Sequence, residues 1–129
     1  MGCECIKACH GSLARKVCAE ARFVGSELLV VVSNENAHIG AVALAEYDDR
    51  TERVSSSVVT RLSHKDDLVA VSAAYQLAKA MRQAVCVVAG IHIDNASGED
   101  IIATQRNAQA AVTKLLKNGL GEDRAMESG

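Results

Sequence analysis

The sequence of 129 residues contains no proline and no tryptophan, and it has only one phenylalanine and two tyrosines. A core without large rings must consist of Val, Ile, Leu and Ala, so we expect helices and strands that pack closely over small side chains. The net charge is only −2, which predicts no general attraction to nucleic acid or anionic membrane. No apolar run has the length of a membrane span, and the first residues do not resemble a secretory signal. We therefore expect a cytoplasmic protein without nucleic-acid or membrane partners.

The composition is otherwise that of a globular protein, with 49% apolar and 23% charged residues. No repeat or linker divides the chain, so residues 1–129 are expected to form a single domain. The five cysteines are an odd number, which favours free thiols in a reducing compartment. Three of them gather with a histidine near the amino terminus as Cys3, Cys5, Cys9 and His10. Their spacing fits a soft-metal site, but cysteines near a terminus act more often as small apolar residues.

Apolar residues alternate or run continuously through the first half of the chain, which predicts strands at 3–9, 15–24, 27–33, 38–47 and 53–62. The spacing then becomes helical over 66–82, where Val69, Ala73, Leu77, Ala80 and Met81 form an apolar stripe. A strand at 84–91 and a helix at 99–117 follow, with Ser97 as the expected N-cap. This order predicts an α+β fold, in which a mainly antiparallel sheet of five to six strands is covered on one face by two helices late in the chain.

The face of the sheet away from the helices needs a second explanation. Residues 27–33 read ELLVVVS, a continuous apolar run typical of a strand that is buried on both faces. A single chain with two late helices covers only one face. We therefore expect a homodimer that pairs through the sheet.

The most promising place for chemistry is AGIHIDNASG at residues 89–98. If the strand continues through Ile93, alternation places Ile91 and Ile93 on one face and presents His92 and Asp94 together on the other. Such a pair suits proton handling, phosphate contact or metal binding. Asp94 and Asn95 are equally good turn formers, so the pattern alone favours neither a site nor a turn.

Two further histidines stand at the ends of apolar segments. His38 is the first residue of the strand predicted at 38–47, and His64 and Lys65 precede two aspartates at the start of the first helix. Helix-start amides beside Lys65 could hold a phosphate, although the carboxylates there favour simple helix capping. If the segment ends share one edge of the sheet, His38, His64 and His92 converge.

The segments HIGAVALAEY, RLSHKDDLVAVSAAYQLAK and above all VVAGIHIDNASGEDI resemble those of small accessory proteins encoded with UbiD-type decarboxylases. These are the LpdD-like proteins of gallate and hydroxyarylic-acid decarboxylase systems, described as prenylated-flavin chaperones. The resemblance runs from about Ala37 to Leu116 and does not include the cysteine cluster. It implies a fold similar to that of proteasome assembly chaperones, which are small α+β dimers.

The resemblance also implies a function. Such a protein would bind prenylated FMN, or FMN itself, or the apo-decarboxylase, and would help to form the active enzyme without being a catalyst. The polar positions in the matched motifs then become the expected cofactor-binding residues, with Lys65 at the phosphate and the residues after the last strand at the ring edge: His38, His64, Lys65, His92, Asp94 and Asn95.

Two other functions stay open at this point. One is a structural component or assembly factor that binds the UbiD-type decarboxylase without flavin. The other is a small metal-dependent enzyme that uses His92 and Asp94 with His38 or His64.

Overall fold

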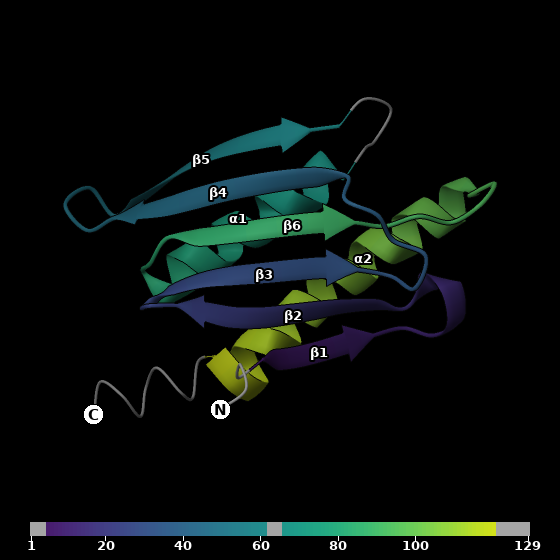
Figure 1. Ribbon diagram of the computed structural model, residues 1–129, viewed down its shortest axis with the longest axis horizontal. Coiled ribbons are helices and arrows are strands. Elements are labelled where there is room, and N and C mark those ends of the chain that lie inside the picture. Colours follow the sequence, from purple (N-terminus) through teal and green to yellow (C-terminus); the bar gives the residue numbers. More distant parts are fainter. Residues whose placement is uncertain (1–4, 62–65, 121–129) are drawn as a thin grey trace.

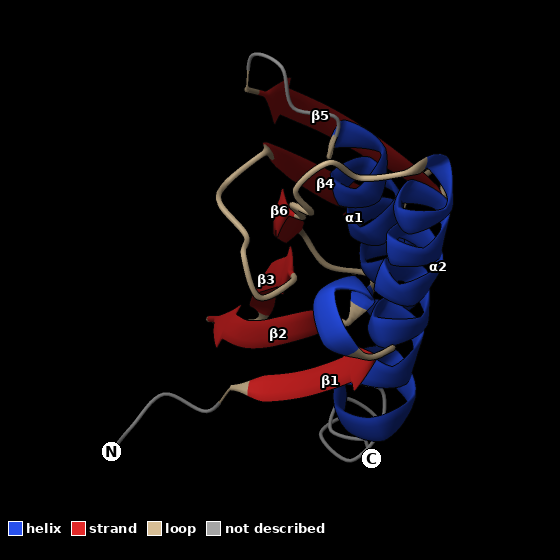
Figure 2. Cartoon of the chain, turned by 90° about the vertical axis from the view of Figure 1, so that its right-hand side faces the viewer, coloured by secondary structure: helices blue, strands red, loops and turns tan. Residues whose placement is uncertain are grey.

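The computed structural model describes residues 5–61 and 66–120, which form one six-stranded sheet with two long helices on one side (Figures 1 and 2). The α+β class and the late position of both helices are confirmed. The elements are β1 (Ile6–His10), a short 3₁₀ turn (Leu13–Arg15), β2 (Val17–Val24), β3 (Glu27–Ser33), β4 (Ala41–Asp48), β5 (Arg53–Thr60), α1 (Asp67–Met81), β6 (Val85–Gly90), α2 (Gly98–Leu115) and a final π-helical turn (Leu116–Leu120).

The strand order is β1-β2-β3-β6-β4-β5, so the last strand of the chain lies in the middle of the sheet. β6 runs parallel to β3 and antiparallel to β4, whereas all other pairs are antiparallel. β3 and β4 follow one another in the chain but do not pair, because β6 lies between them. β6 is hydrogen-bonded along both edges, and its apolar sequence VCVVAG is typical of a central strand with a parallel neighbour.

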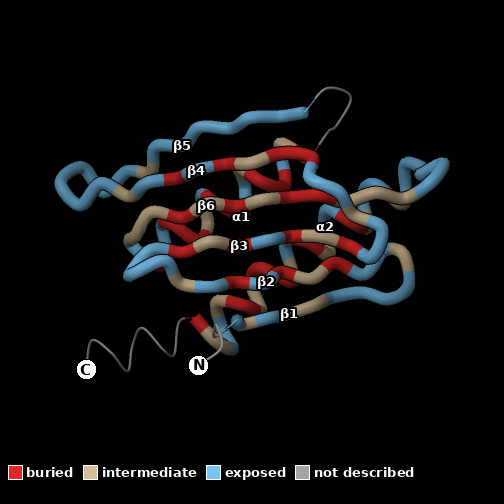
Figure 3. Tube along the Cα trace, in the orientation of Figure 1, coloured by how far each residue is buried: buried red, intermediate tan, exposed pale blue. Residues whose placement is uncertain are grey.

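The core is formed by residues of β2, β3, β4 and β6 and of both helices, and Figure 3 shows the buried parts of these elements. α1 covers β4, β5 and β6, and α2 covers β1 and β2. Alanines such as Ala43, Ala74 and Ala111 are fully buried at these contacts, as the scarcity of aromatic residues predicts. In α1 the predicted stripe is buried except for Ala80, which is exposed.

Neither of the described long helices covers the opposite face of the sheet (Figure 2). Seven apolar side chains occupy directly paired positions on this face, and we call them the open-face patch: Leu29, Val31, Val42, Leu44, Val59, Cys86 and Val88. Val31 is 40% exposed, Leu44 55% and Val59 72%. The expectation that residues 27–33 are buried on both faces is thus wrong for the single chain, because alternate residues of β3 face the uncovered side.

The expectation of free thiols was wrong for one pair. Cys9 of β1 and Cys18 of β2 are register partners and form a disulfide between neighbouring strands. Cys5 and Cys86 are free thiols. Sequence spacing could not reveal this pair, because its proximity depends on the register of the two strands.

Several predicted strand boundaries also shift. The strand expected at 38–47 begins at Ala41, and the strand expected at 53–62 ends at Thr60. The strand expected at 3–9 is Ile6–His10, with residues 3 and 4 outside the described part of the chain. The first of these shifts matters for the site, because it leaves His38 in a connecting segment.

Candidate functional site

The segment from His38 to Gly40 is held tightly at the end of the sheet where β6 finishes. The Gly40 N–H donates to the Ala89 carbonyl oxygen at 2.9 Å, and the Gly40 carbonyl oxygen accepts from the Arg61 N–H at 2.9 Å. The Arg61 guanidinium also donates to the Ile39 carbonyl oxygen at 2.9 Å. A side chain at Gly90 would collide with the His38 backbone. This close approach therefore requires glycine at position 90 and fixes His38 beside the end of β6.

Asn34, at the end of β3, fixes the backbone of the residues after β6 through side-chain hydrogen bonds. Its side-chain amide donates to the His92 carbonyl oxygen at 2.8 Å, and its side-chain oxygen accepts from the His92 N–H at 3.0 Å. The same amide nitrogen donates to the Ala14 carbonyl oxygen at 3.1 Å. Asn34 is only 8% exposed, so these bonds satisfy a polar group that would otherwise be costly to bury. His92 thus sits on a fixed backbone although it lies outside regular structure.

Two of the predicted site histidines come together here. The ring centroids of His38 and His92 are 5.3 Å apart, and His92 Nε2 lies 2.8 Å from an Asp94 side-chain oxygen. β6 ends at Gly90, so the condition that the strand continues through Ile93 is not met. His92 and Asp94 nevertheless meet, because a turn brings their side chains together. Asn95 has a φ of 53° and is exposed, which matches the turn role that its residue type favours.

The other predicted site residues, His64 and Lys65, lie outside the described residues. They precede Asp66 directly in the sequence, and Asp66 lies against Gly40. The convergence of histidines at one sheet edge is therefore seen for His38 and His92, and for His64 it stays a prediction.

An open cavity of about 500 Å³, which we call the strand-end cavity, lies between the residues after β6 and the first turns of both helices. His92, Ile91 and Ile93 line it on the strand side. Its polar lining is mainly acidic, since Asp66 and Asp67 come from the start of α1 and Asp100 from the start of α2. No described lysine or arginine lines this cavity.

A capping box fixes the start of α2 beside the cavity, as the sequence predicts for Ser97. The Asp100 N–H donates to the Ser97 hydroxyl at 3.0 Å, and the Ser97 N–H donates to the Asp100 carboxylate at 2.9 Å. Arg15 pairs with the same carboxylate at 2.8 Å. The Ser97 backbone N–H and the Arg15 guanidinium hold the pKa of Asp100 below its usual 3.8, so this carboxylate stays charged at neutral pH.

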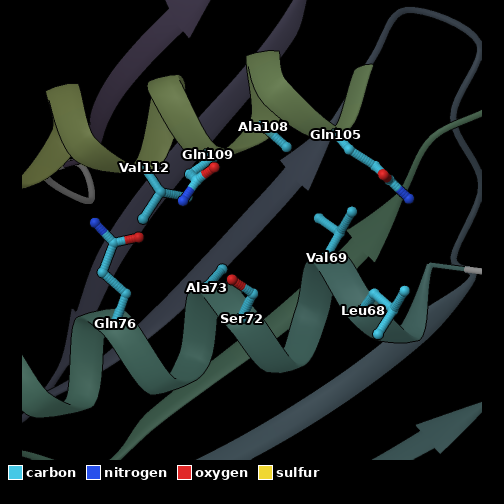
Figure 4. A pocket seen from close by; sticks show the side chains of 9 residues that line it. All are labelled: Leu68, Val69, Ser72, Ala73, Gln76, Gln105, Ala108, Gln109 and Val112. Atoms are coloured by element: carbon cyan, nitrogen blue, oxygen red, sulfur yellow. The ribbon is translucent and has the colours of Figure 1, made fainter. Parts of the chain in front are cut away.

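A second depression, the helix groove, runs between α1 and α2 (Figure 4). Its volume is about 180 Å³, and it shares Leu68, Val69 and Gln105 with the strand-end cavity. Within the part of the chain that the structure describes, no group of three or more His, Cys, Asp or Glu side chains is arranged to hold a metal ion. The lining of the strand-end cavity offers imidazole, carboxylate and amide groups to a polar molecule.

Asn34 is the part of the site that the sequence did not reveal. Its place between two predicted strands indicates a turn, whereas it bridges the ends of β3 and β6. The signal would have been the parallel pairing of these strands, because parallel neighbours end at the same sheet edge. The sequence likewise identifies Asp100 only as a residue at the start of a helix, and not as part of the cavity lining or as the partner of Arg15.

Comparisons with known proteins agree with this architecture. The model of a family described as "prenylated flavin chaperone LpdD-like domain" matches residues 11–119. Among solved structures, the chain is similar to a chain of a chaperone complex for yeast 20S proteasome assembly, with a TM-score of 0.61 and 16% identity. The alignment covers 91% of this chain and 97% of that chain, and at this identity it supports the fold alone. No curated protein matches the chain. None of the described helices is long and apolar enough to cross a membrane.

Proposed function

Because this chain belongs to the prenylated flavin chaperone LpdD-like family, we propose that it is a non-catalytic maturation factor that binds prenylated FMN and delivers it to a UbiD-type decarboxylase. The observation that carries the proposal is the fixed cluster of His38, His92 and Asp94, in which His92 also lines the strand-end cavity. The whole chain acts as one domain in this proposal, and its site of action is the cytoplasm, where the Cys9–Cys18 pair would be reduced.

The site residues have distinct roles in the proposal. His92, with its ring nitrogen held by Asp94, and the nearby Asn95 face the polar edge of the flavin ring, which carries carbonyl oxygens and an N–H group. The His38 ring packs beside the His92 ring and limits how the His92 ring can turn. These groups offer both hydrogen-bond donors and acceptors, as that edge requires.

The phosphate needs positive charge, and the described lining of the cavity is acidic. We propose that the phosphate lies at the outer edge of the site, near His64 and Lys65. Arg61 would add positive charge at this edge. Its guanidinium donates to the carbonyl oxygen of Ile39, the residue after His38. Removing Lys65 is then expected to weaken binding of FMN more than binding of riboflavin, which has no phosphate.

The direct test uses reduced prenylated FMN and the purified protein under anaerobic conditions. We expect the wild-type protein to retain flavin through gel filtration and to raise the fraction of cofactor-loaded decarboxylase. The variant His92→Gln should bind about tenfold more weakly, because one hydrogen bond to a polar ligand contributes roughly 1–1.5 kcal/mol. His10→Gln is the matched control, since His10 lies on β1 and does not line the cavity.

Three outcomes separate the candidate functions. Uptake of flavin with increased decarboxylase loading supports the proposal. Increased decarboxylase activity without any flavin uptake favours an assembly factor that binds only the enzyme. No effect on cofactor content or activity contradicts both.

We further propose that two copies pair through the open-face patch. The patch spans β3, β6, β4 and β5, and its neighbours on the same face include both signs of charge at Lys7, Glu20 and Arg22. Six strands of this length present roughly 600–700 Å² in projection, which approaches the roughly 800 Å² per partner of a stable interface. Covering exposed Leu44 and Val59 would then remove the largest uncovered apolar side chains of the sheet from water.

Light scattering during gel filtration tests the homodimer. We expect the wild-type mass to be twice that of the chain and Leu44→Asp to be monomeric, because a buried carboxylate would face an apolar partner. Ile102→Asp is the control, since Ile102 is 52% exposed and lies on the helix layer. A wild-type protein that is monomeric at high concentration would contradict the pairing without affecting the flavin proposal.

A further inference from the structure

The helix groove between α1 and α2 has a lining unlike that of the strand-end cavity. Its floor consists of small apolar side chains from both helices, with Ala73 at 5%, Ala108 at 2% and Val112 at 1% exposure. Figure 4 shows these residues facing one another across the space between the helices. None of the residues that line the groove is charged. The groove therefore offers an apolar surface that water covers poorly and that an apolar group would cover well.

The groove and the strand-end cavity are adjacent, because Leu68, Val69 and Gln105 line both. A flat ligand whose polar edge is bonded at His92 would reach the groove past these three side chains. Amide side chains border the groove, and one of them, Gln76, is oriented by donating to the Thr113 hydroxyl at 3.2 Å. The site thus has a polar end and an apolar end at a fixed orientation.

We propose that the helix groove receives the isoprenoid-derived ring of prenylated FMN and makes the protein prefer this cofactor over FMN. This inference rests on the proposed function and adds the choice of flavin to it. The isoprenoid-derived ring is apolar and is fused to the flavin away from the phosphate-bearing chain. It is also the feature that distinguishes the two cofactors. A ligand with its polar edge at His92 and its phosphate outside would direct this added ring toward Ala73 and Ala108.

The expected preference follows from the apolar surface that is buried. Each buried methylene contributes about a fourfold gain in affinity. The added ring has several such carbon groups, and a groove that is partly open buries only part of their surface. We therefore expect a preference of at least about tenfold for reduced prenylated FMN over reduced FMN. The added ring needs empty space in the groove. A larger side chain that fills the groove should therefore remove the preference for prenylated FMN over FMN.

The experiment compares the dissociation constants of both reduced flavins for three proteins under anaerobic conditions. Ser72→Leu fills the groove from an exposed position of α1 and should not disturb the core. Ala80→Leu is the matched control, because Ala80 is exposed on the same helix and does not line the groove. We expect Ser72→Leu to bind the two flavins within about twofold of each other, with FMN binding unchanged, and Ala80→Leu to keep the wild-type preference.

Other results would overturn the inference. A wild-type protein without preference excludes a selective groove, and so does a preference that survives Ser72→Leu. Equal weakening of both flavins by Ser72→Leu would mean that the groove holds a part that they share. In all of these cases flavin binding itself, and with it the proposed function, stands. Binding of neither flavin by the wild-type protein contradicts both.

Discussion

Gly90 is the position where a single methyl group should disturb both the fold and the site. A Cβ at this residue would meet the backbone of His38, with the His38 carbonyl carbon only 2.8 Å away. Ordinary van der Waals contact begins at 3.4 Å, and the neighbour here is backbone, which cannot rotate away as a flexible side chain does. The segment 38–40 would have to move by on the order of 1 Å in Gly90→Ala.

The energetic cost has two parts. Overpacking typically costs about 1–3 kcal/mol, and straining the 2.9 Å bond from the Gly40 N–H to the Ala89 carbonyl oxygen adds about 0.5–1.5 kcal/mol. We expect Gly90→Ala to lower the free energy of unfolding by about 2–4 kcal/mol. The displaced His38 should also weaken flavin binding, since its ring packs against that of His92.

Urea denaturation followed by circular dichroism measures the first effect, and anaerobic flavin titration the second. Gly98→Ala is the control, because a Cβ at Gly98, the first residue of α2, meets no atom within 4 Å. That variant should be neutral or gain up to about 1 kcal/mol. If Gly90→Ala unfolds within about 0.5 kcal/mol of the wild-type protein, the close approach of these two segments is not a constraint, and the reasoning is refuted.

Three further changes have defined outcomes. Asn34→Ala should cost about 2–4 kcal/mol in urea denaturation and weaken flavin binding, because both polar backbone groups of His92 lose their partner. Cys18→Ser should cost about 2–3 kcal/mol under oxidising conditions and little in reducing agent, since the disulfide closes a loop with a sequence separation of 9. The pKa of Asp100 is lowered by folding, so its stabilising effect is complete above 3.8 and disappears as the pH falls through the folded pKa. Asp100→Asn should flatten this part of the acid unfolding curve, and an unchanged curve would contradict the pairing with Arg15.

Local patterns predicted the order of strands and helices and the proximity of His92 and Asp94. Alternation in residues 15–24 identified the buried face of β2, and Ser97 was correctly recognised as the cap of α2. These features depend on neighbours in the sequence, where periodicity carries the information. The meeting of His38 with His92 was predicted only conditionally, since it required a shared sheet edge.

The remaining features depend on contacts between distant residues. The position of β6 beside β3, the Asn34 bridge to His92 and the Cys9–Cys18 pair all follow from the strand order and register. A turn residue that joins two strand ends looks the same in the sequence as one that only reverses the chain. For Asn34 the surrounding fold gives the amide its partners, so no local pattern could identify its role.

The central place of β6 also has a consequence for how the chain folds during synthesis. β1, β2 and β3 can pair with one another early, as can β4 and β5, but no strand joins the two groups until residues 85–90 have left the ribosome. Until then β3 and β4 each present an unpaired edge, which is the kind of surface that pairs with other chains. Contacts between residues so distant in sequence form slowly. The nascent chain is therefore most vulnerable to aggregation between the completion of β5 and the arrival of β6, an interval that includes the whole of α1.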